Sequence, residues 1–238
     1  MNSRGVLVKY IIPKISIMDG LGVIFVVPAL ASFSQAHPRL QIQLKSPSNY
    51  KSLREIQTDI MIGFSPETSA DLTSIRLGSL HLMPFASSAY IQRLGVPDRE
   101  NLADHEFVNT EIFASQNDIW KPWHAAIAQG KVTHTAEGSI TYAMMVKAGL
   151  GIGLLANYNA LEPHATPINL GVSISLPLYL VGVTERLQSK PVQIVASFLG
   201  HLFGTENPWF AERPIFEVED DRFTYGYNML FNLGAHRT

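Results

Sequence analysis

Apolar and polar residues in the first 63 positions follow strand-like and helix-like patterns in turn. Residues 6–12 are rich in β-branched side chains, and residues 40–44 alternate between apolar and polar, as half-buried strands do. Apolar residues within 19–36 recur at three- and four-residue spacing, which is typical of a helix with one buried face. A second helix is expected at 49–58, followed by a continuous apolar strand at 59–63. This order predicts a parallel sheet covered by helices on both faces.

A second series of elements begins near residue 75. Two short strands are expected on either side of Gly78 and Ser79, and a longer strand over 176–183. The other expected elements are strands at 106–109, 132–135 and 151–155 and helices at 88–95, 119–129, 139–148 and 190–203. Two small βαβ-type units bridged by long strands predict an α/β protein of two lobes with a cleft between them.

Residues 18–40 allow two interpretations. A secretory signal needs a basic start, an apolar stretch and a small-x-small cleavage site, and residues 21–31 provide the last two. Asp19 stands just before the apolar stretch, and the β-rich run at 6–12 precedes it, which are not features of a signal. A helix with Asp19 as its N-cap would end naturally at His37-Pro38, because the residue before a proline disfavours helix. The pattern favours the helix.

The composition narrows the class of protein. The chain has 238 residues, 46% hydrophobic and 16% charged, which is enough to bury a sizeable core in one domain or two lobes. A net charge of −2 provides no basic surface for nucleic acid phosphates. The absence of cysteine excludes disulfides and thiolate metal sites. We expect no membrane span, because the chain has no run of about 18 or more residues that are all uncharged and apolar.

The last segment, 205–238, differs from the rest of the chain. It carries seven aromatic residues, three basic residues and six acidic residues. This content is too aromatic for typical disorder, so the segment is expected to pack on the body of the protein or on a partner.

Motifs for cofactor, metal or catalytic chemistry are weak. Gly151, Gly153 and Ala156 match a dinucleotide-binding pattern, but a helix precedes them and the apolar run within them is the expected strand. The glycines are better explained by the end of that helix and by close packing. His134 and Glu137 are the nearest approach to a metal pair, and no third ligand accompanies them. We therefore expect no cofactor, no metal site and no catalytic residues.

Polar residues at the expected helix starts are the remaining candidates for binding. First-turn amides and the helix dipole attract anions, and ligands of open α/β sheets collect at the carboxyl ends of the strands. The alternative is that Asp19, Asn49 and Ser139 are ordinary N-caps. The polar residues at these starts are Ser16, Asp19, Ser46, Ser48, Asn49 and Ser139.

The same segments carry a family resemblance. In order and spacing they resemble the effector-binding domain of LysR-type transcriptional regulators over about residues 6–203. Trp120-x-x-Trp123 resembles the glycine-cleavage-activator-like branch of that family. The segments that carry the resemblance are 16–44, 58–64, 76–97, 101–108, 118–127, 137–158 and 177–202.

The resemblance implies two Rossmann-like subdomains with a central cleft, as in type 2 periplasmic binding proteins. Subdomain I would comprise 6–85 plus 185–204 and subdomain II 86–184, with 205–238 as a C-terminal extension of unknown role. It also implies a cytoplasmic homodimer or homotetramer that binds a small-molecule effector, such as an organic or amino acid. Operator DNA would be bound only through a helix-turn-helix domain, which we do not find in this sequence.

Site residues follow from the resemblance as well. Asp19 would repel a carboxylate effector or pair with an amine. Phe85 and Val183 would act as hinges. The implied effector contacts are Ser16, Met18, Asp19, Ser46, Ser48, Asn49, Phe64, Ser65, Asn109 and Ser139.

Two other functions stay open on the sequence. A solute-binding protein for a transporter would share the fold, but export with cleavage would remove the first strand and the start of the first helix. An enzyme on the same scaffold would need acid and base groups in the cleft, for which Asp19, His134 and Glu137 are the weak candidates.

Overall fold

The computed structural model describes residues 11–47, 53, 57–114 and 117–219. The predicted helix at 49–58 lies mostly outside these residues, and so do Ser48, Asn49 and the segment 220–238. The first strand described is Lys14–Ser16. The prediction of a strand at 6–12 was wrong for Ile11 and Ile12, which precede this strand, and residues 6–10 lie outside the description.

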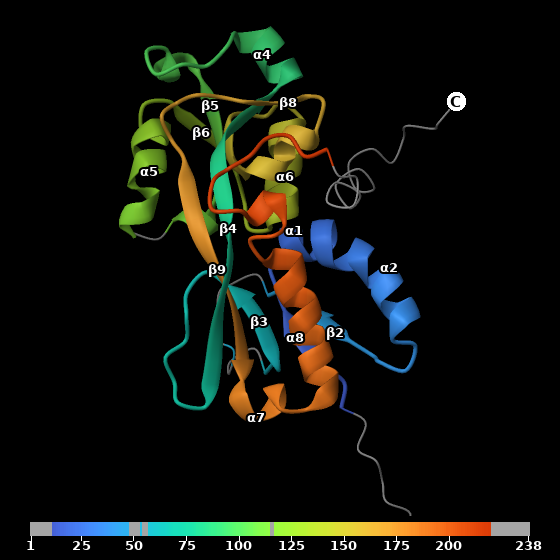
Figure 1. Ribbon diagram of the computed structural model, residues 1–238. Helices are drawn as coiled ribbons and strands as arrows, with labels where there is room; N and C mark the ends of the chain where they lie inside the picture. Colours follow the sequence, from blue (N-terminus) through green and yellow to red (C-terminus); the bar gives the residue numbers. More distant parts are fainter. Residues whose placement is uncertain (1–10, 48–52, 54–56, 115–116, 220–238) are drawn as a thin grey trace, which may run out of the picture.

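The strands form one mixed sheet of seven and one sheet of two (Figure 1). The order in the large sheet is β2-β1-β3-β9-β4-β7, with β8 also paired to β4, and β5 pairs with β6. Pairing is parallel for β1–β2 and β1–β3, as predicted for the strands within residues 6–63, and for β5–β6. It is antiparallel wherever β4 or β9 takes part, so the sheet as a whole is mixed. The strands are β1 (Lys14–Ser16), β2 (Gln43–Lys45), β3 (Ile60–Gly63), β4 (Leu72–Ser87), β5 (Glu106–Thr110), β6 (Lys131–Ala136), β7 (Gly153–Ala156), β8 (Ala165–Pro167) and β9 (Ile174–Val183).

Two long antiparallel strands, β4 and β9, extend from one end of the molecule toward the other (Figure 1). Around them, β1, β2 and β3 with α2 (Val27–Ala36), α7 (Thr184–Leu187) and α8 (Lys190–Phe203) form lobe I. Lobe II is formed by β5 to β8 with α4 (Ser88–Leu94), α5 (Lys121–Ile127) and α6 (Ser139–Lys147). The two short strands expected around Gly78 are one continuous strand. Its pairing with β9 shifts register between Arg76 and Ser79, and this irregularity falls between the parts of β4 that belong to the two lobes.

The first helix is continuous but changes pitch. It begins as α1 (Asp19–Leu21), widens into a π-helical segment, η1 (Gly22–Val26), and continues as α2 (Val27–Ala36). Pro28 accounts for the widening, because it lacks an N–H and its ring clashes with the carbonyl four residues earlier. The helix ends just before His37-Pro38, as predicted.

The helix over Asp19–Ala36 has the length and composition to cross a membrane, with a mean hydropathy of 1.4 over its 18 residues. A core helix passes the same test. Here Leu21, Ile24 and Phe25 are buried in the core, and β1 lies between β2 and β3. Cleavage near Ala31 would remove β1 and these core residues, so the structure agrees with a helix of a folded domain.

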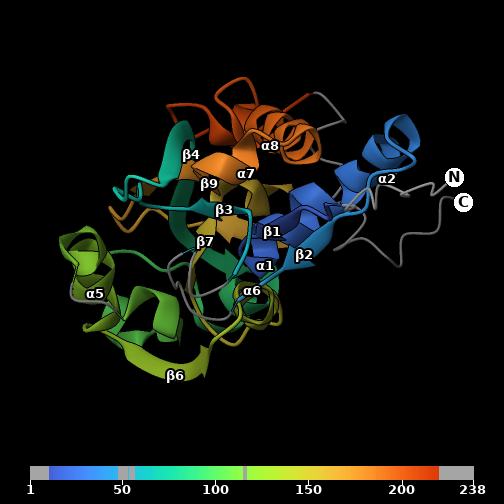
Figure 2. The same cartoon turned by 90° about the horizontal axis from the view of Figure 1, so that it is seen from below.

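The other helices cover the sheet and close lobe II. In α8, Val192, Val195, Leu199 and Phe203 are buried along one face, and the helix packs on β9 and β4 (Figure 2). The apolar pattern predicted Ile194, Val195, Phe198, Leu199 and Leu202 on this face, and Ile194, Phe198 and Leu202 are only partly buried. The remaining α-helices are α4 (Ser88–Leu94), α5 (Lys121–Ile127), α6 (Ser139–Lys147), α7 (Thr184–Leu187) and α8 (Lys190–Phe203).

Residues 204–215, named here the C-terminal strap, run from the end of α8 toward lobe II. The short 3-10 helix η6 (Pro208–Phe210) within the strap buries Trp209 and Phe210 completely. Of the two alternatives for this segment, the residues described up to Glu219 follow the first, since the strap packs on the body of the protein.

Candidate functional site

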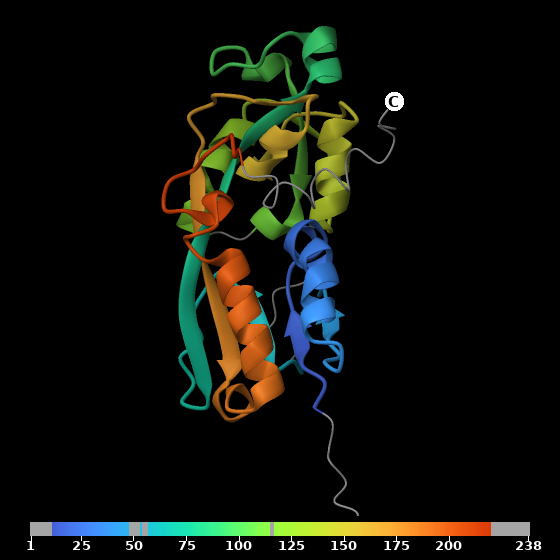
Figure 3. The same cartoon turned by 45° about the vertical axis from the view of Figure 1, so that its right-hand side comes forward.

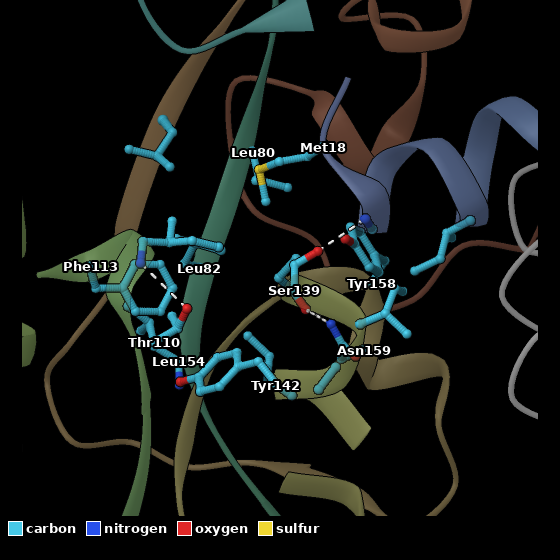
Figure 4. A pocket seen from close by; sticks show the side chains of 18 of the residues that line it. Met18, Leu80, Leu82, Thr110, Phe113, Ser139, Tyr142, Leu154, Tyr158 and Asn159 are labelled. Atoms are coloured by element: carbon cyan, nitrogen blue, oxygen red, sulfur yellow. Dashed lines mark hydrogen bonds between the residues drawn. The ribbon is translucent and has the colours of Figure 1, made fainter. Parts of the chain in front are cut away.

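A pocket lies between the lobes (Figure 4). It lies where α1 faces the N-terminal end of α6, in the region where the ribbons of the two lobes meet (Figure 3). Its cavity measures about 60 Å³, and the space reaches about 600 Å³ when the open region in front of it is included. Lobe I, lobe II and the long strands all contribute to its wall. The lining residues are Met18, Gly20, Ile24, Phe64, Leu80, Leu82, Thr110, Ile112, Phe113, Ser139, Ile140, Tyr142, Ala143, Leu154, Leu155, Ala156, Tyr158, Asn159 and Leu176.

The wall of the pocket is mostly apolar, and its polar groups are largely engaged with the protein. The Tyr142 hydroxyl accepts a hydrogen bond from the Leu154 amide at 2.6 Å and donates to the Val108 carbonyl at 3.3 Å. Burial raises the pKa of Tyr142, so this phenol stays neutral. Among the described residues that line the pocket there is no lysine, arginine or histidine.

The carboxylate of Asp19 joins the lobes at the mouth of the pocket. Its Oδ1 accepts hydrogen bonds from the Ser139 amide at 3.3 Å and from the Ser139 hydroxyl, and its Oδ2 accepts from the Ile140 amide at 3.4 Å. The Gly20 amide donates to Asp19 Oδ1 at 2.8 Å and to Ser139 Oγ at 3.0 Å. We call this group of bonds the Asp19 contact.

Two glycines allow the close approach at the Asp19 contact. A Cβ at Gly20 would lie 2.7 Å from Ser139 Oγ, which is too close for a side chain there. A Cβ at Gly138 would lie 3.3 Å from Asp19 Oδ2, which is a tight contact. Each lobe therefore presents bare backbone to the other at this point.

The structure places only part of the predicted site at the pocket. Met18, Phe64 and Ser139 line it, and Asp19 lies beside it. Ser16 is buried within β1, whereas Ser46 and Ser65 are exposed. Asn109 is engaged away from the pocket, since its Oδ1 accepts a hydrogen bond from Trp123 Nε1 at 3.2 Å.

The predicted N-caps of two helices were wrong by one position. Met18, and not Asp19, is the N-cap of α1, and Gly138, and not Ser139, is the N-cap of α6. The Asp19 side chain instead accepts hydrogen bonds from the first amides of α6. This helix begins at Ser139, 120 positions later in the chain.

The two predicted hinge residues lie away from the irregularity in β4. Phe85 is fully buried and pairs with Gly153 of β7 and Pro167 of β8, deep in lobe II. Val183 pairs with Leu72 at the far end of lobe I.

Sequence reasoning missed most of the apolar wall. Thr110, Ile112 and Phe113 follow β5, and Tyr142 and Ala143 lie on the helix that Ser139 begins. Tyr142 stands three residues after Ser139, on the same face of α6, which is the one signal in the sequence that pointed to it. The other wall residues look like ordinary core positions.

The weaker motifs do not converge on the pocket. His134 and Glu137 are exposed and line no part of it. Within the part of the chain that the structure describes, no three histidine, aspartate or glutamate side chains are grouped to hold a metal ion. Gly153 lies in strand β7, and a Cβ there would collide with Val146 at 2.3 Å, which confirms the explanation by close packing.

Comparison with known structures shows the same fold. The regulatory domain of CrgA, a LysR-type transcriptional regulator from Neisseria meningitidis, matches with a TM-score of 0.68 and 19% identity over 81% of this chain and 98% of that one. The effector domain of AmpR from Pseudomonas aeruginosa matches with a TM-score of 0.65 and 14% identity over 82% and 97% of the two chains. Full-length AphB of Vibrio cholerae matches with a TM-score of 0.63 and 17% identity over 80% of this chain and 68% of that one.

Comparison with curated protein sequences gave no match. The family model of the LysR substrate binding domain matches residues 14–203. The fold of two lobes around a curled mixed sheet agrees with this match, and so does the pocket between the lobes. The chain belongs to the LysR substrate-binding domain family, the effector-binding domains of LysR-type transcriptional regulators.

Proposed function

We propose that a small-molecule effector binds in the pocket between the lobes and that its binding changes how the lobes are arranged. One observation carries this proposal: residues of lobe I, lobe II and the long strands all line the same pocket. A ligand in it would contact both lobes at once, and its affinity would therefore differ between arrangements of the lobes.

The wider proposal concerns the regulator as a whole. The effector-bound domain would act within a cytoplasmic homodimer or homotetramer, and the change would reach operator DNA through a helix-turn-helix domain. The subdomain boundaries expected from the resemblance put hinges for this movement at Phe85 and Val183, although the register shift between Arg76 and Ser79 lies nearer the junction of the lobes. Trp120 packs on Phe113 of the pocket wall, which is consistent with a role for the W-x-x-W segment of the glycine-cleavage-activator-like branch.

A thermal-shift screen of the chain against amino acids, aromatic acids, neutral aromatics and small organic acids tests ligand binding. A compound present at about 100 times its Kd stabilises the folded state by roughly 2.7 kcal/mol. For a chain of this length the midpoint of unfolding should rise by roughly 5–10 °C.

A pair of matched variants locates the binding. Ala143→Phe adds a ring inside the pocket, whereas Ala125→Phe adds the same ring on an exposed face of α5. The first variant should lose the ligand-induced shift and the second should keep it. If both variants keep the shift, the ligand binds elsewhere and the proposed site is wrong.

A further inference from the structure

We propose that Asp19 is a built-in anion in the cleft and that the pocket therefore selects an uncharged, apolar effector over a carboxylate. This inference rests on the proposed function, namely that an effector binds in this pocket.

The position that would receive a ligand carboxylate is already filled by the protein. The N-cap of α6 is Gly138, which has no side chain to satisfy the first amides of the helix. Asp19 reaches across from lobe I and accepts hydrogen bonds from the amides of Ser139 and Ile140 and from the Ser139 hydroxyl. A carboxylate ligand would have to displace Asp19 to reach these donors.

The negative charge of Asp19 also disfavours the binding of an effector that carries a carboxylate. No basic side chain among the described residues lines the pocket, so within the part of the chain that the structure describes an entering carboxylate would meet the negative charge of Asp19 without a lining cation to offset it. The charge of Asp19 reaches the pocket wall, because together with burial it raises the pKa of Tyr158, whose side chain lies in that wall (Figure 4).

The wall offers mainly apolar contact. Leu80, Leu82 and Leu176 of the long strands line the pocket together with Ile112, Phe113 and Leu154 of lobe II. The Tyr142 hydroxyl has both a donor and an acceptor partner, and Asn159 Nδ2 donates to the Ala156 carbonyl at 2.9 Å. A neutral aromatic or aliphatic molecule with at most one or two polar groups matches this lining.

A rescue experiment tests the built-in anion without knowledge of the effector. Asp19→Ala removes the carboxylate and leaves the amides of α6 exposed to a small anion. Acetate should raise the melting temperature of this variant relative to chloride at equal ionic strength, and it should leave the wild type and Asp118→Ala unchanged. Asp118 is the matched control because it is an exposed aspartate that forms an ion pair with the exposed Lys121. If acetate shifts the melting temperatures of all three proteins equally, the proposal that Asp19 is a built-in anion is wrong.

Matched ligand pairs test the selectivity. Calorimetry or thermal shift compares benzyl alcohol with benzoate, indole with indole-3-carboxylate, and cyclohexanol with cyclohexanecarboxylate. The wild type should bind the neutral member at least about tenfold more tightly, and Asp19→Ala should reverse or abolish this preference. Asp19→Asn should reduce it, because the amide keeps a hydrogen-bond acceptor and loses the charge.

The outcomes separate the two proposals. Tighter binding of the acids by the wild type, lost in Ala143→Phe, would overturn the selectivity and keep the proposed function. Binding of the neutral compounds that is lost in Ala143→Phe supports both. Absence of binding by the wild type and by Asp19→Ala would overturn the proposed function, and the selectivity with it, even where acetate rescue succeeds.

Discussion

Two connections join the lobes, and they differ in chemistry. The Asp19 contact is polar, partly accessible to solvent, and placed at the mouth of the pocket. The C-terminal strap is held by three buried residues, Asn207, Trp209 and Phe210, and passes β4 on the side opposite the pocket, whereas Thr205, Glu206 and residues 212–214 are exposed. Alternation along β4 separates them, because Leu80 and Leu82 line the pocket whereas His81 between them faces the strap.

The strap has the character of a core element. Phe210 packs edge-on against Phe25 and Phe203, with ring centroids 4.9 and 5.2 Å away. His81 is fully buried and its Nε2 lies 2.7 Å from the Ala211 carbonyl. Since a carbonyl only accepts, Nε2 carries the hydrogen of this bond. Asn157 of lobe II then donates to the Ile215 carbonyl at 2.9 Å, so the strap is attached at both lobes.

The difference assigns separate roles to the two connections. Burial of large aromatic side chains dominates folding energy, whereas partly exposed hydrogen bonds add little net stability. The strap should therefore hold the lobes together, and the Asp19 contact should set the charge and the ease of opening of the pocket.

The largest expected effect comes from removing the anchor of the strap. Trp209→Ala deletes a fully buried indole and should lower the free energy of unfolding by about 3–5 kcal/mol, measured by urea denaturation. Phe216→Ala is the matched control, because Phe216 is 40% exposed and should cost little. Similar losses in both variants would mean that the strap is not a core element.

A second variant, Gly78→Ala, disturbs the contact between the strap and β4 from the β4 side. A Cβ at Gly78 would lie 2.1 Å from the Phe210 carbonyl, so Gly78→Ala must push the strap away from β4. We expect a loss of about 1–3 kcal/mol in urea denaturation. Gly200→Ala in α8 meets no atom within 4 Å and should instead stabilise the protein by up to about 1 kcal/mol. A neutral Gly78→Ala variant would show that the backbone of the strap does not press on β4.

Gly78 also shows why the sequence predicted some elements and not others. The helix 190–203 was predicted with its observed bounds because its apolar face repeats within a single segment. Gly78-Ser79 was interpreted as a break between two strands, since glycine and serine are common in turns. The glycine is instead required by the passage of Phe210, which is more than a hundred residues away in the chain. Such a tertiary reason leaves no local pattern.

The residues of the pocket also divide into those that were predicted and those that were missed. Ser139 was predicted because it begins a helix, which is a local feature, whereas Met18 and Phe64 were implied by the family resemblance. The apolar wall was missed, since residues such as Leu154 line a pocket only because the lobes meet there. The partner of Asp19 was missed for the same reason, because a carboxylate before a helix is ordinarily the cap of that helix.

The Asp19 contact should contribute less to stability than the strap. Asp19→Ala removes a carboxylate that caps α6 and should cost about 1 kcal/mol, in line with the loss of a helix cap. Asp118→Ala, at an exposed ion pair, should cost less than about 0.5 kcal/mol. A loss in Asp19→Ala as large as that in Trp209→Ala would remove the distinction between the two connections.

The smallest expected effect is that of Ser139→Ala, at about 0.5 kcal/mol. The variant loses the hydroxyl that donates to Asp19, but the Gly20 amide keeps its 2.8 Å bond to Asp19 Oδ1. Because both side chains belong to one set of bonds, the double variant with Asp19→Ala should cost less than the sum of the single variants. Ser139→Ala and Trp209→Ala share no partner, so their costs should add. Additive costs for Asp19 and Ser139 would mean that the contact is two separate bonds, and coupling of Ser139 to Trp209 would mean that the strap and the pocket mouth move together.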